Sequence, residues 1–541
     1  MTYRRRLERR ERRPRGGSLK PVHFAGVRRP SLMNSHDQMP VCSGGVHVRR
    51  PRDASFIRSP IPWNPEVFMS FELNIGDSMA VLLVDGIEDT PYVGATLRMK
   101  ATGVEVEVPY LPGFSVPQFT HVNEWFRKMT PPDNVLVYTR EGTVTLYGCR
   151  WSGHADASGT RVGSGSFTAR EALLRDRDRP LSDALLVQRC YSRVDGMNRW
   201  SRATAVSSES DLDEDSRTTG LTISVKSPAA VEWRQGEATL RVRSIWRFSS
   251  TNEADSRVHE LDDNVVLESE WNEPRPFVDH LVEQRKVLHL LVFLFAKPLS
   301  FRKHLVQDES IAARLMNGEI FDHPFTEVIS SRTMRERAQP MIPSKDLDRP
   351  LLVLDELGTD GLTEWAERYE TWERFILPAV TSLGQRRRFA EDIVMNMSMS
   401  IEAASHLLGS RPGENATHRN GRPTTATHAY RCLEVLGIKW GDYIHSQIGL
   451  AKAIANNYNA VKHADRGGFP DAGQTILIGD VIELVVRLIA VRLTGQGDEL
   501  IERYRRGSEL WPIEQRFDSY RIRIVDDRGT WEEHVPDADG Q

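Results

Sequence analysis

The sequence predicts a multidomain α+β protein, in which a β-rich N-terminal domain resembling a sandwich or an irregular barrel precedes an all-α helical bundle. Three observations support this prediction. The chain of 541 residues is too long for a single compact core. Its first half contains short β-branched runs separated by turn residues. Its second half contains long amphipathic runs at helical spacing.

The composition is that of an ordinary globular protein with a basic N-terminal extension. Charged residues make up 27% and hydrophobic residues 39% of the chain. Residues 1–60 contain 15 Arg or Lys and 4 Asp or Glu, a charge of +11, so the other 481 residues carry −15 of the total of −4. We expect this extension to be disordered; an arm that binds nucleic acid is the alternative.

Targeting and redox features indicate the cytoplasm. The extension lacks the apolar segment of a secretory signal. The four cysteines are scattered without paired spacing, which is typical of a reducing compartment. The longest apolar run, 287–296, is about half a membrane span and contains a histidine, so we expect a buried helix and no membrane association.

Changes in the hydrophobic and turn-residue pattern along the chain predict five segments. Runs such as "GVEVEVPY" and "ATLRVRSIWRFSS" indicate strands, and "RPFVDHLVEQRKVLHLLVFLFAKP" is the first strong helix, which Pro298 ends. Helical patterns dominate from residue 362. The expected segments are a basic extension (1–65), a β-rich domain ending in a helix (66–300), a mixed connecting region (301–361), a helical bundle (362–508) and a C-terminal tail (509–541).

A polar stripe on one predicted helix, Asp442–Ala464, is the strongest functional signal. At ~100° per residue, five polar side chains fall within roughly 40° of one line, while the opposite side is apolar. The stripe has no carboxylate, unlike a solvated face, and its lysine, amides and histidines suit an anionic partner and proton transfer near neutral pH. An ordinary polar or interface surface would also explain it. Its members are His445, Lys452, Asn456, Asn459 and His463.

Other candidate sites are weaker. Glu402 and His406, one turn apart in "SIEAASHLL", more often form a local helix contact than a site. The acidic loop Ser207–Arg217 lacks the glycine and the closing glutamate of a calcium loop. We therefore expect neither a metal nor a cofactor.

The segment "NNYNAVKHADRG" resembles the HEPN family (higher eukaryotes and prokaryotes nucleotide-binding), and the long chain resembles its ApeA-type subgroup. The blocks "VDGMNRWSRATAV", "EPRPFVDHLVEQRKVLHLLVFLF" and "SMSIEAASHLL" also resemble that subgroup, over roughly residues 70–510. The resemblance implies a β-rich ApeA-like domain, a dimeric HEPN-type bundle, and a role in bacterial defence against phage.

In HEPN ribonucleases the signature is Arg, a polar residue, three further residues and His. Asn459 and His463 match the last two conserved positions, whereas Tyr458 occupies that of the arginine. The resemblance implies that His463 and Asn459 are catalytic in a metal-independent endoribonuclease that leaves 2′,3′-cyclic phosphate ends. The side chains expected to bind the substrate are Lys462, Lys452, Arg466, Asn456 and Tyr458.

The expected partners are RNA, with tRNA as a candidate, a second copy of the chain bound through the helical bundle, and a phage-derived trigger. Two other functions stay open. Tyr458, which carries no cation, favours a catalytically inactive module for RNA binding or dimerisation. The basic extension favours a DNA-associated regulator, although no recognition-helix pattern accompanies it.

Overall fold

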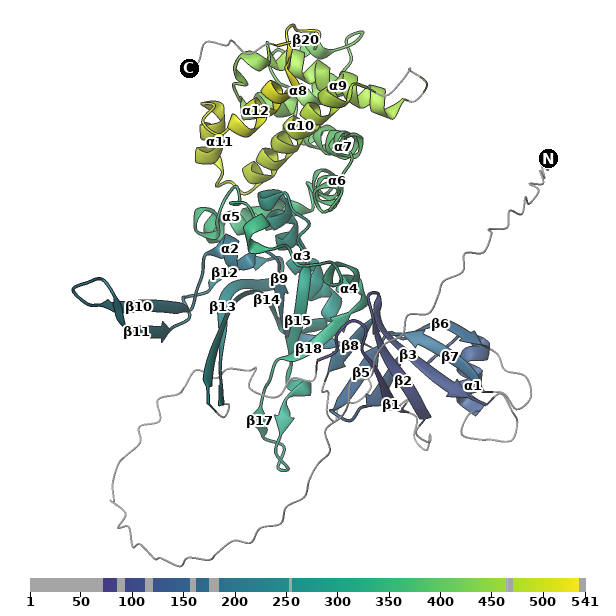
Figure 1. The fold of residues 1–541 in the computed structure, drawn as a ribbon. Helices are drawn as coiled ribbons and strands as arrows, with labels where there is room; N and C mark the ends of the chain where they lie inside the picture. Colours follow the sequence, from purple (N-terminus) through teal and green to yellow (C-terminus); the bar gives the residue numbers. More distant parts are fainter. Residues whose placement is uncertain are drawn as a thin grey trace, which may run out of the picture. The chain divides into compact units, whose positions relative to one another are not determined.

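The computed structural model describes residues 72–84, 93–111, 120–155, 162–174, 184–252, 255–463, 465 and 470–534. The basic extension predicted over 1–65 lies outside these residues. Within them, no helix is both long and apolar enough to cross a membrane. The β-rich first part and the helical second part confirm the predicted α+β class (Figure 1).

Within the described residues, fourteen strands form one antiparallel sheet, in the order β12-β13-β14-β9-β15-β18-β8-β5-β4-β1-β2-β3-β7-β6. This order has two free ends, so the sandwich or barrel of the prediction takes the form of one open sheet. The strands are β1 (Ser78–Val84), β2 (Val93–Lys100), β3 (Gly103–Tyr110), β4 (Asn134–Tyr138), β5 (Thr143–Tyr147), β6 (Arg150–Ala155), β7 (Gly163–Thr168), β8 (Glu171–Leu174), β9 (Leu186–Val194), β12 (Val231–Gln235), β13 (Ala238–Asn252), β14 (Arg257–Pro276), β15 (Phe301–Gln307) and β18 (Thr326–Ser330).

Alternating burial explains why these runs form strands. In β2, Val93, Ala95, Leu97 and Met99 are buried, and the residues between them are exposed or half-buried. Three small hairpins lie outside the sheet: β10 (Val206–Leu212) with β11 (Thr218–Val225), β16 (Ala313–Arg314) with β17 (Ile320–Asp322), and β19 (Ile522–Ile524) with β20 (Trp531–Glu533).

Twelve α-helices occur in the described part of the chain. They are α1 (Thr120–Lys128), α2 (Met197–Ser201), α3 (Phe277–Phe295), α4 (Ser331–Arg337), α5 (Leu354–Tyr369), α6 (Glu373–Leu383), α7 (Ala390–Leu408), α8 (Thr425–Leu436), α9 (Gln447–Lys462), α10 (Ala472–Leu493), α11 (Asp498–Arg505) and α12 (Trp511–Tyr520). Helices α7, α8, α9 and α12 all contact α10, whose residues are buried over most of its length (Figure 1).

Helix α3 is the buried helix that the apolar run predicts. Its residues from Val287 to Phe295 are all buried, and it contacts both the sheet and the helices α6 and α10. Arg487 of α10 donates hydrogen bonds to the carbonyl groups of Phe293 and Leu294 at the end of α3, at 2.8 and 2.9 Å. One hydrophobic core consequently extends from strands β12–β14 through α3 into the helical region.

The segments on either side of the bundle contain ordered elements. Strands β15 and β18 belong to the segment 301–361, and both pair in the interior of the sheet order. Helix α12 and the β19–β20 hairpin belong to the segment after residue 508. Phe517 and Ile524 of that segment are buried in the same core as the bundle helices, so the segment packs as part of the helical region.

Candidate functional site

Helix α9 carries the polar stripe, but it is shorter than the sequence predicts. It begins after Ser446, whose Oγ accepts a hydrogen bond from Gly449 N at 3.0 Å, a normal N-cap. His445 precedes the cap, and its N–H donates to Ile524 O at 2.8 Å. The prediction that His445 shares the helical stripe is therefore wrong, because the hydrogen bond of its N–H to Ile524 of β19 holds this residue ahead of the helix.

The buried face of α9 fixes the orientation of the helix. Leu450, Ile454 and Tyr458 are at most 6% exposed. Asn457, also buried, donates from Nδ2 to Thr475 Oγ1 of α10 at 3.0 Å. These contacts leave Lys452 and Asn459 half-buried and Asn456 exposed, so three members of the stripe lie on the less buried side.

Asn459 and His463 lie at the C-terminal end of α9. His463 is the C-cap, with φ −112° and ψ 87°, and its N–H donates to Asn459 O at 3.1 Å. Both side chains are half-buried, and within the described residues neither forms a side-chain hydrogen bond. The predicted pair is thus one turn apart at the end of α9.

Tyr458 anchors the lysine that follows it by one turn. Lys462 Nζ donates to Tyr458 Oη at 3.2 Å and lies 5.2 Å from the centroid of the tyrosine ring. The tyrosine is 6% exposed, whereas Lys462 is exposed. The ring therefore supports an ammonium group next to His463 in the sequence, although it carries no charge itself.

The other predicted ligand-binding residues are farther away or lie outside the described residues. At 1.5 Å of rise per residue, Lys452 is about 16 Å along the helix axis from His463, and Asn456 is about 10 Å away. These two residues therefore lie well before the end of the helix that carries His463. Arg466 lies outside the described residues.

A second polar cluster joins α7 to α8. Glu402 and His406 lie in the last turns of α7, and His428 lies in the first turn of α8. One potential ligand atom from each lies within 4.8 Å of the others. The sequence suggested the first two as a pair but missed His428, because a loop separates it from them and only tertiary packing brings it close.

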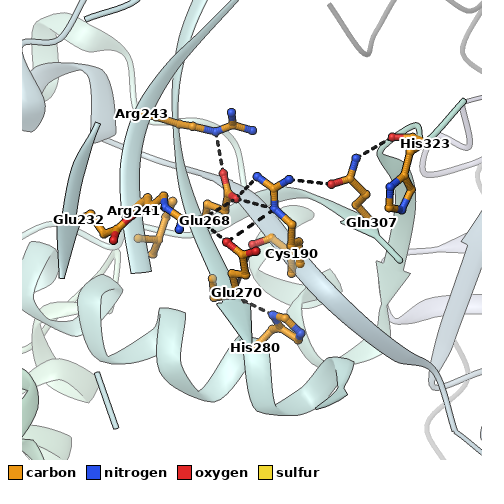
Figure 2. Close-up of polar contacts among 12 residues, drawn as sticks. Cys190, Glu232, Arg241, Arg243, Glu268, Glu270, His280, Gln307 and His323 are labelled. Atoms are coloured by element: carbon orange, nitrogen blue, oxygen red, sulfur yellow. Dashed lines mark hydrogen bonds and ion pairs between the residues drawn. The ribbon is translucent and has the colours of Figure 1, made fainter. Parts of the chain in front are cut away.

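The sheet contains a charged network around Glu268, whose side chain is fully buried (Figure 2). Arg189 donates to Glu268 Oε1 from Nε at 2.9 Å, and Arg243 forms an ion pair with Oε2 at 2.7 Å. Arg241 bridges this carboxylate to those of Glu232 and Glu270.

Three guanidinium groups in this network face three carboxylates. The charges therefore balance within the protein, and the arrangement stabilises β9, β12, β13 and β14 without an added anion. We assign it a structural role.

Comparison with known families adds a match for the sheet. Residues 91–365 match the family described as ApeA N-terminal domain 1. No curated protein and no solved structure matches the chain. The matched residues extend from β2 into α5, whereas α6–α12, which hold the stripe and the second cluster, lie outside the match.

Proposed function

This chain belongs to the ApeA family, a family of anti-phage defence proteins, and from that premise we propose that its helical part is a metal-independent endoribonuclease that cleaves RNA on infection. The observation that carries the proposal is the spacing of Asn459 and His463 by one turn at the end of α9, where Tyr458 holds the side chain of Lys462, the residue before His463. The sheet domain would act as a sensor or a brake that responds to a phage-derived trigger.

The proposed reaction is a transesterification within RNA. His463 removes the proton of the ribose 2′-hydroxyl or protonates the leaving 5′-oxygen. The 2′-oxygen attacks the adjacent phosphorus as the bond to the 5′-oxygen breaks, which leaves a 2′,3′-cyclic phosphate and a 5′-hydroxyl. Asn459 orients the histidine or donates a hydrogen bond to a phosphate oxygen. A second His463 from a dimer would supply the complementary acid or base.

Lys462 replaces the family's arginine as the source of positive charge in this proposal. The C-terminal end of a helix carries partial negative charge, which repels a phosphate, so the site needs a cation. Tyr458 holds the lysine side chain by a hydrogen bond and a cation–π contact, which limits the entropy that the side chain loses when it binds phosphate.

A catalytically inactive module for RNA binding or dimerisation is the second candidate. The observation in its favour is that Tyr458, at the position of the family's arginine, is buried and carries no charge, and its hydroxyl group contacts Lys462. Lysine lacks the two-pronged geometry with which arginine holds a phosphate. This candidate predicts RNA binding without cleavage.

Inducible expression of the wild type, His463→Ala and His445→Ala, followed by sequencing of RNA ends, separates the two functions. His445→Ala is a matched control, since this exposed histidine lies just before α9 and outside the stripe. We expect cyclic-phosphate ends, with tRNA examined first, in the wild type and the control but not in His463→Ala. A digest of purified RNA in EDTA should give the same pattern. Equal cleavage by His463→Ala would refute the catalytic role.

A further inference from the structure

The ends of α7 and α8 place a glutamate and two histidines around one point. The ring centroids of His406 and His428 are 5.0 Å apart, and a carboxylate oxygen of Glu402 lies within 4.8 Å of a nitrogen of each ring. Glu402 and His406 are exposed and His428 is half-buried. The group therefore faces solvent on one side and is anchored to the bundle on the other.

Ser405 contacts one ring nitrogen of His428. The hydroxyl group of this buried serine is 2.9 Å from Glu402 O, to which it can donate, and its oxygen is 2.5 Å from His428 Nδ1. In the tautomer with the proton on Nδ1, that nitrogen donates to Ser405 and Nε2 has the lone pair for a metal ion. A hydrogen bond on the far nitrogen of a histidine is the usual support for a metal-binding imidazole.

A second argument concerns the types of donor. Two imidazole nitrogens and one carboxylate oxygen, a donor set that suits transition-metal ions, lie within 4.8 Å of one another. A divalent cation is the partner that satisfies all three groups at once.

We propose that Glu402, His406 and His428 bind a divalent transition-metal ion, with Zn²⁺ as the best match to two nitrogens and one carboxylate oxygen. Tetrahedral ligands at about 2.1 Å from zinc are about 3.4 Å from one another, so the donors must close by at most about 1.4 Å. Glu402 and His406 are the exposed members of the cluster, so their side chains are the ones expected to move.

The ion would connect the last turns of α7 to the first turn of α8 across the loop 409–424. Its role would be to fix these two helices, since the cluster shares no residue with the proposed nuclease site. A structural zinc ion at this cluster is compatible with RNA cleavage that uses no catalytic metal. Loss of zinc binding and loss of RNA cleavage can therefore be observed independently of each other.

Zinc binding by the purified full-length chain tests the proposal directly. The wild type, His406→Ala, His428→Ala and the control His445→Ala would be stripped with chelator and dialysed against a range of free Zn²⁺ concentrations. We expect the wild type and the control to bind one more equivalent of Zn²⁺ than either His406→Ala or His428→Ala. Circular dichroism of the stripped proteins checks that every variant is folded, and RNA cleavage is not part of the readout.

The serine gives a finer test. Ser405→Ala should still bind the additional equivalent of Zn²⁺, but roughly 10-fold more weakly, because the imidazole of His428 loses its hydrogen bond to the serine. Equal metal content in the wild type and both histidine variants, whether zero or more, would overturn the proposal. The same Co²⁺ absorption spectrum in the wild type and His428→Ala would overturn it as well.

Discussion

Replacing His289 with phenylalanine should make the protein less sensitive to mild acid. His289 lies on α3 with 8% of its surface exposed, and its Nδ1 is 2.6 Å from the hydroxyl oxygen of Tyr369 on α5. Burial, with a smaller effect of the Arg285 guanidinium, lowers the pKa of this histidine from 6.5 to about 4. The ring is therefore neutral in the folded protein from pH 7 to pH 5.

The pKa difference gives the size of the effect. As the pH falls below 6.5, the unfolded chain takes up a proton on His289 and the folded chain does not, so the folded state loses relative stability until the pH reaches about 4. For pKa values of 6.5 and about 4, this loss is about 2 kcal/mol at pH 5 and close to zero at pH 7.

Phenylalanine keeps the ring and removes the titration. The lost contact with Tyr369 should cost about 1–3 kcal/mol at either pH. The unfolding free energy of the wild type minus that of His289→Phe should therefore be about 2 kcal/mol lower at pH 5 than at pH 7. Guanidinium unfolding followed by tryptophan fluorescence measures this difference. The control is His259→Phe, the same substitution at an exposed histidine.

A difference in unfolding free energy between the wild type and His289→Phe that is the same at both pH values would refute the argument. It would mean that the histidine is solvated or already protonated in the folded protein, in contradiction to its burial between α3 and α5.

Three further predictions concern the sheet, α9 and the proposed nuclease site. Glu268→Gln should lower the unfolding free energy by about 3 kcal/mol in guanidinium titrations, because it removes the buried carboxylate that three half-buried guanidinium groups share. The exposed Glu273→Gln should change it by less than about 0.5 kcal/mol. Gly449→Ala should destabilise the chain by about 1–3 kcal/mol in thermal melts, since the added Cβ would lie 2.3 Å from a backbone oxygen of the β19–β20 turn. In the control Gly479→Ala the added Cβ would lie 3.6 Å from its nearest neighbour. This variant should be as stable as the wild type or up to about 1 kcal/mol more stable. Lys462→Ala should slow RNA cleavage roughly 100-fold in single-turnover assays, and an unchanged rate would exclude it as the phosphate cation.

Local sequence pattern predicted much of this protein. Short β-rich runs between turn residues marked the strands. Helical spacing marked α3 and the helices of the bundle, because it follows from which side of a helix faces the core. The boundaries of α9 were harder to predict from the sequence. Ser446 and the pairing of His445 with Ile524 set its start, and the second of these contacts joins residues far apart in the chain.

The sequence by itself determined the α+β class, the order of its parts, the family, and the spacing of Asn459 and His463, since these depend on local pattern and on chain order. Only the tertiary structure decided that fourteen strands form one open sheet, that Tyr458 supports Lys462 from a buried position, and that His428 meets Glu402 and His406. Such contacts depend on how helices and strands pack, and packing links residues whose separation along the chain carries no periodic signal.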